Sequence, residues 1–339
     1  MLKIFSVALI ILCFSSMSLA LENDSRVFKI YPEIKVEKAH FHNRYGIDLT
    51  GDLYFPKDFD ATKKYSAIAV AGPFGAVKEQ VSGLYAQEMA KFGYVALAFD
   101  PSFTGESGGN VRYAASPEIN TEDFSAAVDF LSVQNFVDPE KIGLIGVCGW
   151  GGIGLNAVAA DTRVKAYVAS TMYDMSRVAA NGYFDADNSA DKRYEAKKAL
   201  NAQRIVDYKN GTYAKAGGVI DPLTEDAPQF VKDYYAYYKT PRGYHKRSVN
   251  SNAGWTVTSS LAMVNMKMLS FVDEIRTPVL LVHGEKAHSR YLSEGVFKML
   301  KGDNKELFIV PDASHVDLYD NMEKIPFAKI KTFFDTYMK

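Results

Sequence analysis

The stretch from residue 141 to residue 152, KIGLIGVCGWGG, constrains the fold more than any other part of the chain. Its apolar run at 142–147 is typical of a buried strand, and a segment with helical composition follows at 153–160. Cys148 stands between them in a cluster of glycines. A sharp turn from a strand into a helix strains the residue at its apex and requires small neighbours. The pattern therefore predicts a strained, exposed Cys148 as the candidate nucleophile of an active site.

Two features complete this interpretation, and one alternative competes with it. The amide of Gly149 would lie at the N-terminus of the following helix, where partial positive charge favours a thiolate or an oxyanion. Trp150 occupies a place where a small residue is usual, and we expect Gly151 to serve instead. The alternative is a buried cysteine that only fills space. That alternative leaves the glycines around the thiol without an explanation.

Composition argues against several classes of function. The chain has 339 residues, with 39 Lys and Arg against 40 Asp and Glu, and a formal net charge of −1. A chain of this length buries one large core, or a core with an insertion. Its basic residues form no stripe and no long run, so the sequence predicts neither a nucleic-acid partner nor a polybasic membrane patch.

The N-terminal segment has the features of a signal peptide. Lys3 precedes a mostly apolar run at 4–14, and Ser18 and Ala20 fit the small-x-small rule for cleavage. The run is shorter than the about 20 apolar residues that a membrane span needs, which argues against an uncleaved anchor. We therefore expect residues 1–20 to be removed and the protein to be exported, periplasmic or secreted, without stable membrane insertion. The other cysteine of the chain lies in this segment, so the mature protein would keep a single thiol.

The rest of the chain alternates between predicted strands and helices. Alternating apolar residues at 34–37 and 47–55 indicate a β-hairpin, and continuous apolar runs indicate buried strands. These runs lie at 67–71, 94–99, 142–147, 164–170, 278–284 and 307–310. Strands that alternate with helices predict an α/β fold, with a mostly parallel sheet covered by helices on both faces.

Residues 172–273 break this rhythm. They contain helical segments, a tyrosine-rich run at 234–238 and no clear strand, and they are too long for a connecting loop. We expect a helical cap over the active site here, with residues 21–171 and 274–339 forming the core. The aromatic residues of the cap would line a pocket for an apolar substrate or, as an equal alternative, pack the cap on the core.

Two motifs carry a family resemblance. The spacing Gly146-x-Cys148-x-x-Gly151 resembles the G-x-S-x-x-G elbow of X-prolyl dipeptidyl peptidase-like hydrolases, whereas the cysteine itself resembles that of dienelactone hydrolase. The segment 100–109 resembles the D-x-x-G-x-G-x-S-x-G loop of α/β-hydrolases, except that Phe103 replaces its first glycine. With its strand order and a histidine after the last strand, the chain resembles the cysteine-nucleophile branch of the α/β-hydrolase superfamily. That branch includes dienelactone hydrolase-like proteins and the polyketide transferase family.

This resemblance implies an acyl-transfer mechanism on a small-molecule acyl substrate. Cys148 would attack the carbonyl of an ester, lactone or thioester, and His315, on the loop after the last strand, would take the thiol proton. The amides of Gly149 and Phe74 would hold the oxyanion, because Pro73 has no amide hydrogen to give; a plain turn is the alternative for that loop. A helix N-terminus beside His315 also predicts a low pKa for the thiol. Neither a metal nor an organic cofactor is called for.

The acid that would orient His315 departs from the family pattern. The place aligned with the usual carboxylate, a few residues after the seventh strand, holds Ala287. Glu285 lies on the same loop and is preferred on chain order, and Asp174, after the sixth strand, is the second candidate. The alternatives are an ion pair of Glu285 with a neighbouring Lys or Arg, and helix capping by Asp174. If neither carboxylate serves, Cys148 and His315 form a dyad.

Two other functions stay open on the sequence. An acyltransferase would pass the acyl group to an alcohol or an amine instead of water. A catalytically silent binding protein would use the same scaffold without turnover, since fold does not fix function. His40 and His42 share a face of a strand but have no third ligand nearby, so a metal site is not expected.

Overall fold

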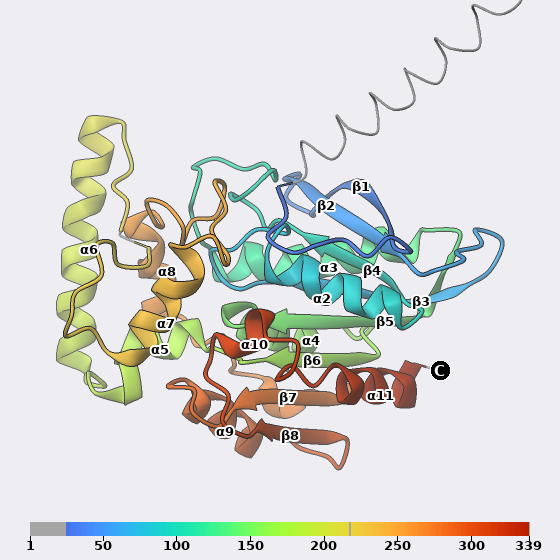
Figure 1. Ribbon diagram of the computed structural model, residues 1–339. Helices are drawn as coiled ribbons and strands as arrows, with labels where there is room; N and C mark the ends of the chain where they lie inside the picture. The colour runs from blue at the N-terminus through green and yellow to red at the C-terminus, as the bar shows by residue number, and fades with distance from the viewer. Residues whose placement is uncertain (1–24, 217, 339) are drawn as a thin grey trace, which may run out of the picture.

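The computed structural model describes residues 25–216 and 218–338, which form an eight-stranded sheet in the order β1-β2-β4-β3-β5-β6-β7-β8 (Figure 1). The strands β1 (Lys35–His42) and β2 (Asp48–Phe55) form the antiparallel hairpin expected from their alternating pattern. The later strands are β3 (Tyr65–Ala71), β4 (Val95–Phe99), β5 (Val137–Val147), β6 (Ala166–Ser170), β7 (Val279–Gly284) and β8 (Lys305–Val310). These six run parallel to one another, which confirms the predicted mostly parallel sheet.

Helices cover the sheet because its central strands are apolar on both sides. Every residue of β4, β6 and β7 is buried. The helices of this core are α2 (Val81–Lys91), α3 (Pro117–Ser132), α4 (Gly149–Ala160), α9 (Arg290–Met299), α10 (Asp317–Asp320) and α11 (Phe327–Met338). α3 and α4 pack together against β5, and α2 meets α11 through the rings of Tyr85 and Phe327, whose centroids are 5.0 Å apart.

The segment between β6 and β7, which we call the insertion, has only helices among its described named elements. These are α5 (Met175–Asn181), η1 (Tyr183–Asp185), α6 (Ala190–Asn210), α7 (Gln229–Tyr238), η2 (Val257–Ser259), α8 (Ser260–Asn265) and η3 (Val272–Glu274). Figure 1 shows the insertion at the carboxyl ends of the parallel strands, with α6 standing away from the sheet. Open α/β sheets bind their ligands at this edge. The insertion therefore lies where a site is expected.

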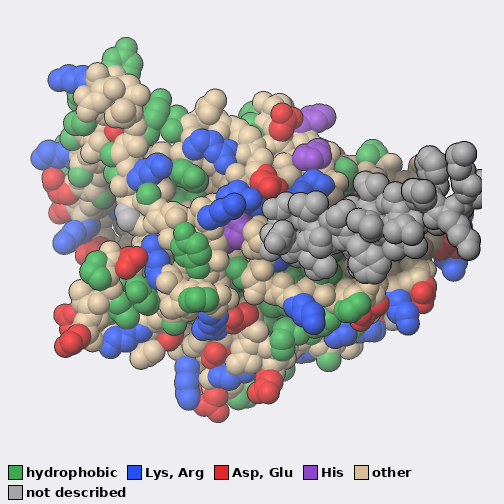
Figure 2. All heavy atoms as spheres, turned by 45° about the horizontal axis from the view of Figure 1, so that its top comes forward, with side chains coloured by type: hydrophobic (Ala, Val, Ile, Leu, Met, Phe, Trp, Pro, Cys, Tyr) green, Lys and Arg blue, Asp and Glu red, His purple; other side chains and the backbone are tan. Residues whose placement is uncertain are grey.

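The surface carries both signs of charge. In Figure 2, Lys and Arg side chains are interspersed with Asp and Glu side chains over the visible face. His40 and His42 are exposed on β1, and no group of three or more His, Cys, Asp or Glu in the described part of the chain could hold a metal ion. Among the described helices, none is both long and apolar enough to cross a bilayer. The signal peptide predicted at 1–20 lies outside the described residues.

Candidate active site

Cys148 lies at the apex of the turn from β5 into α4. Its backbone has φ 58° and ψ −126°, in a region that is strained for a residue with a side chain. The amide of Cys148 donates a hydrogen bond to the carbonyl of Ser170 at 2.9 Å. The carbonyl of Cys148 accepts from the amides of Gly151 at 2.8 Å and Tyr173 at 2.9 Å. The predicted strained apex is confirmed, and neighbouring backbone holds it in place.

The thiol is buried, whereas the sequence predicted an exposed one. Only 8% of Cys148 is exposed. Four tyrosines interact electrostatically with the thiol: Tyr173, Tyr234 and Tyr238 from the insertion, and Tyr319 from α10. The side chain is covered because the insertion and α10 close over the apex of the turn.

Small residues at the apex are required by close backbone contacts. A Cβ on Gly146 would lie 2.2 Å from the carbonyl oxygen of Trp150, and one on Gly151 would lie 2.9 Å from Cα of Met172. The indole of Trp150 is buried in the core, with its ring centroid 5.3 Å from that of Phe124. Trp150 is therefore tolerated, and Gly151 supplies the small residue that the turn needs.

The two predicted oxyanion donors meet at the thiol. The backbone amides of Gly149 and Phe74 both make polar contacts with the Cys148 side chain that favour its charged form. Phe74 belongs to residues 72–80, which follow β3 and which we call the oxyanion loop. A Cβ on Gly149 would lie 2.6 Å from Cβ of Phe74, so the two backbones approach as closely as glycine permits.

The insertion fixes the position of Phe74. The side-chain amide of Asn250 donates to the carbonyl of Phe74 at 2.7 Å, and the backbone amide of Asn250 donates to the carbonyl of Gly75 at 3.1 Å. The ring of Phe74 stacks on Trp255 with centroids 4.2 Å apart. Residues of the insertion therefore set the direction of the amide that faces Cys148.

The thiol does not have the low pKa that the sequence predicted. Burial raises the pKa of Cys148, and the neighbouring Tyr319 hydroxyl and the amides of Gly149 and Phe74 offset that effect only in part. Desolvation disfavours a thiolate more than a helix N-terminus favours it at this site. The free enzyme therefore holds Cys148 as a neutral thiol at neutral pH.

We predict that alkylation of Cys148 by iodoacetamide will show an inflection above pH 8.5, since about 8.5 is the pKa of an unperturbed thiol. Burial keeps the thiol protonated at lower pH, and only the thiolate reacts. Labelling rates measured by intact mass across the neutral and alkaline range check this, with the urea-unfolded chain as the matched control. An inflection below that of the unfolded chain would contradict the prediction.

His315 lies on the loop between β8 and α10, close to the same tyrosines. Its ring centroid is 5.5 Å from that of Tyr319 and 5.4 Å from that of Tyr234, both of which interact with the thiol. Burial lowers the pKa of His315 well below its usual value, so the imidazole is neutral at neutral pH. Nε2 has no hydrogen-bond partner among the described residues. The structure thus brings Cys148 and His315 to one cluster, in which Nε2 of a neutral imidazole is not engaged by another described residue.

Neither predicted carboxylate orients His315. Glu285 is exposed and accepts a hydrogen bond from the backbone amide of Asp312 at 2.9 Å. Asp174 caps α5 by accepting from the amide of Arg177 at 3.0 Å, and it lines a cavity of about 490 Å³ that neither Cys148 nor His315 lines. The assignment of Glu285, and of Asp174 as its substitute, is therefore corrected. Glu285 bonds to the backbone of the loop after β8, Asp174 bonds to the first turn of α5, and the capping alternative for Asp174 is confirmed.

Hydroxyl groups occupy the place of the acid. Nδ1 of His315 lies 2.6 Å from Oγ of Ser289 and 2.9 Å from Oγ1 of Thr171. Thr171 directly follows β6, and Ser289 lies two residues after Ala287, the position aligned with the usual acid. The sequence analysis missed both residues, as well as Tyr319. The signal available for Ser289 was its place on the expected loop.

Aromatic side chains enclose the histidine. His288 stacks on Phe230 with centroids 4.3 Å apart, and its ring centroid is 5.4 Å from that of His315. Burial lowers the pKa of His288 to about 4, and neither of its ring nitrogens has a hydrogen-bond partner among the described residues. Tyr183 and Tyr234 complete this group. Aromatic residues of the insertion therefore pack around His315, which is one of the two roles that the sequence predicted for them.

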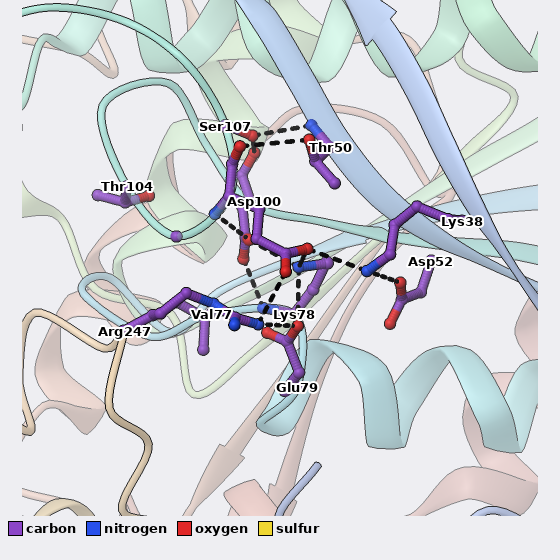
Figure 3. Close-up of polar contacts among 12 residues, drawn as sticks. Lys38, Thr50, Asp52, Val77, Lys78, Glu79, Asp100, Thr104, Ser107 and Arg247 are labelled. Atoms are coloured by element: carbon purple, nitrogen blue, oxygen red, sulfur yellow. Dashed lines mark hydrogen bonds and ion pairs between the residues drawn. The ribbon is translucent and has the colours of Figure 1, made fainter. Parts of the chain in front are cut away.

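A cluster of buried charges holds the oxyanion loop (Figure 3). The fully buried ammonium group of Lys78 donates to Glu79 and Asp100 at 2.8 Å, and to Glu106 at 2.7 Å. Burial alone would lower the pKa of Lys78, but the carboxylates of Asp100 and Glu79 raise it and keep the lysine charged. Arg247 from the insertion pairs with Glu79 and Glu106. These ion pairs tie together the oxyanion loop, the loop at 100–109 and the insertion.

The loop at 100–109 keeps the backbone of a glycine-rich loop despite Phe103. Phe103 has φ 74°, in the left-handed region that favours glycine, and its amide donates to the carbonyl of Gly108 at 2.7 Å. Asp100, at the start of the loop, accepts from the backbone amide of Lys78 at 2.8 Å. The loop therefore presents Asp100 to the oxyanion loop.

Two bacterial proteins are similar to this chain over most of its length. The chain is 52% identical to the protein PA2218 of Pseudomonas aeruginosa over 314 residues, which cover 92% of this chain and 84% of the relative. It superposes on the crystal structure of PA2218 with a TM-score of 0.90, covering 93% of this chain and 98% of that one. It is 34% identical to YcjY of Escherichia coli K12, over 81% of this chain and 89% of the relative.

Two fungal proteins add to this comparison. The α/β hydrolase GrgF from Penicillium sp. sh18 superposes with a TM-score of 0.73 at 20% identity, covering 90% of this chain and 99% of that one, which shows a shared fold. The thiohydrolase aneE of Aspergillus aculeatus is 38% identical over 124 residues, or 37% of each chain. The sequence pattern of the X-Pro dipeptidyl-peptidase (S15) family matches residues 45–317. With its mostly parallel sheet and its strained elbow, this chain is a hydrolase with the α/β-hydrolase fold and belongs to the X-Pro dipeptidyl-peptidase (S15) family.

Proposed function

We propose that the enzyme hydrolyses thioesters, together with esters or lactones that have good leaving groups, through an acyl intermediate on Cys148. The observation that carries the proposal is the convergence of the amides of Gly149 and Phe74 on a thiol at a strained turn. A thiol in this position can act as the nucleophile, and the two amides can hold the oxyanion that forms. One such donor contributes about 3 kcal/mol to catalysis in a related enzyme.

The surroundings of His315 favour a thioester over an amide substrate. Among the described residues, the partners of Nδ1 are the hydroxyls of Ser289 and Thr171, and burial lowers the pKa of the imidazole. A carboxylate in their place would stabilise an imidazolium during the reaction. An amine must be protonated by that imidazolium as it leaves, whereas a thiolate, whose conjugate acid has a pKa of about 8.5, leaves with little help. A histidine held by neutral groups therefore suits a thiolate leaving group.

In each half of the proposed reaction, His315 takes one proton and passes it on. Nε2 accepts the thiol proton as Sγ of Cys148 attacks the substrate carbonyl carbon. The tetrahedral intermediate then collapses, the bond to the leaving sulfur breaks, and that sulfur takes the proton from His315. Water attacks the acyl-Cys148 thioester and gives a proton to Nε2. The second collapse releases a carboxylic acid and returns the proton to the sulfur of Cys148.

The name of one relative and the name of the family bear on the substrate. The thiohydrolase aneE has, by its name, the proposed chemistry, and it matches 37% of this chain. The family name, X-Pro dipeptidyl-peptidase, denotes peptide cleavage. The leaving-group argument separates the two, because only the peptide requires a strong general acid at the step in which the amine leaves.

Trapping the acyl-enzyme tests this proposal. After mixing with a small aryl thioester and an acid quench, the intact mass should show one acyl group, and Cys148→Ala should show none. Turnover of the thioester should exceed that of an X-Pro p-nitroanilide by about 10²-fold or more, the usual contribution of the general acid that the amide needs.

Four outcomes would count against the proposal. Faster turnover of the nitroanilide, or undiminished turnover by Cys148→Ala, would overturn it. An ester product in the presence of added alcohol, without free acid, would support an acyltransferase instead. No acyl group on Cys148 and no turnover of any acyl substrate would support a binding protein.

A further inference from the structure

A chain of buried hydrogen bonds leads from His315 away from Cys148 into the core. Nδ1 of His315 lies 2.6 Å from Oγ of Ser289, and that oxygen lies 2.9 Å from Nε2 of His283. Nδ1 of His283 lies 2.6 Å from Oγ of Ser293. Three of the four residues are fully buried, and His315 is 2% exposed. This row of hydrogen bonds contains no carboxylate. It begins at Nδ1 of His315, where the acid of a triad would contact the imidazole.

Two arrangements of hydrogens form all three bonds and also give the hydroxyl hydrogen of Ser289 an acceptor. A neutral imidazole has one N–H donor and one acceptor nitrogen, and a serine hydroxyl donates one hydrogen. In the first arrangement, His315 donates from Nδ1 to Ser289, Ser289 donates to His283, and His283 donates to Ser293. In the second, all three bonds are reversed, so that His315 carries its proton on Nε2. The first leaves Nε2 free to accept the thiol proton, and the second blocks it.

The hydroxyl of Thr171 favours the first arrangement. Two oxygens, from Ser289 and Thr171, lie at 2.6 Å and 2.9 Å from Nδ1 of His315. An N–H group can be shared between two acceptors, whereas the single lone pair of an unprotonated Nδ1 would accept from only one hydroxyl.

We propose that Ser289 and His283 are positioning residues that replace the missing triad acid by holding His315 in the tautomer whose Nε2 accepts a proton. This inference rests on the proposed function of Cys148 and His315. A carboxylate fixes the tautomer and also stabilises the imidazolium. The Ser289–His283 pair fixes the tautomer without adding negative charge. The pair would therefore orient the imidazole without stabilising the imidazolium, which suits leaving groups that need little protonation.

The tautomer can be observed without any substrate. In ¹⁵N NMR of the full protein with labelled histidine rings, His315, assigned by its loss in His315→Gln, should show a protonated Nδ1 and an unprotonated Nε2 at neutral pH. A protonated Nε2 in the free enzyme overturns the proposal. Since no turnover is involved, this result is independent of whether Cys148 forms an acyl-enzyme.

Substitutions of the residues in this row of hydrogen bonds should lower kcat and leave KM nearly unchanged. Ser289→Ala should lower kcat about 10²-fold, less than the about 10⁴-fold caused by a wrong tautomer in a related triad, because Thr171 still accepts from Nδ1. His283→Phe keeps the hydroxyl of Ser289 but removes its acceptor, so that hydroxyl turns toward Nδ1. This variant should shift His315 toward the Nε2-protonated tautomer in the spectrum and lower kcat further than Ser289→Ala.

Two controls distinguish positioning from general loss of structure. Ser176→Ala removes another buried hydroxyl, one that donates to Asp174, and should leave both kcat and the His315 spectrum unchanged. Glu285→Gln should keep kcat within about twofold of the wild type, as expected for an exposed side chain away from the imidazole. A loss in Glu285→Gln that exceeds the loss in Ser289→Ala would overturn the proposal. If a variant folds poorly, the wild-type spectrum still decides the tautomer.

Discussion

Replacing His315 by alanine should lower kcat for a thioester about 10⁶-fold, as removal of the histidine does in a related triad enzyme. The physical reason is the burial of Cys148, the proposed nucleophile. Burial raises the pKa of the Cys148 thiol, so few molecules carry a thiolate at neutral pH, and the reaction depends on a base that removes the proton during attack. Burial lowers the pKa of His315, which keeps that base unprotonated. Without it, only the oxyanion amides and substrate binding would still assist the reaction.

The pH dependence of the variant checks this explanation. The residual rate of His315→Ala should rise with pH up to the pKa of the thiol itself, because hydroxide then replaces the imidazole. Steady-state turnover of an aryl thioester measures both effects. His40→Ala, at an exposed position on β1, is the matched control and should change kcat less than about twofold. Retention of more than about 1% of wild-type kcat by His315→Ala would show that another group removes the thiol proton.

Replacing Lys78 by methionine should lower the free energy of unfolding by about 3–5 kcal/mol, the usual cost of removing one partner from a buried ion pair. Lys78 and Asp100 are both fully buried, and methionine fills the space of lysine but removes the cation that pairs with Asp100. Burial already raises the pKa of Asp100, and Lys78 opposes that effect. In the variant, Asp100 would bind a proton in the folded state at pH values where the unfolded chain has lost it. The loss of stability should therefore grow as pH rises.

Urea unfolding at two pH values measures this effect. Lys63→Met is the matched control, since Lys63 is 69% exposed and pairs with Asp60 at the surface, where such pairs contribute about 0–1 kcal/mol. Lys78→Met should also lower kcat, because the cluster holds the oxyanion loop. A stability change as small as that of Lys63→Met would contradict the prediction and show that the carboxylates find other partners.

The sheet and the elbow could be predicted because their signals are local. A run such as 142–147 has no polar side chain, so it must be buried on both faces of a sheet whatever lies elsewhere in the chain. Gly146 and Gly151 indicate that other backbone segments lie close to the turn. In the structure, a Cβ on either glycine would clash with a neighbouring backbone atom. Strand order then predicts that His315 and Cys148 share one edge, because the loops after parallel strands meet there.

The proton chemistry of the site was decided only by tertiary structure. Whether Cys148 has a low or a high pKa depends on how much of it the insertion covers, and desolvation outweighs a helix N-terminus once the thiol is buried. The sequence showed that Ala287 cannot be the acid, but it could not show which groups contact Nδ1 of His315. Those groups, Ser289 and Thr171, come from loops after different strands. Their hydroxyls reach the imidazole only through the packing of β6, β7 and β8 side by side, which no local pattern encodes.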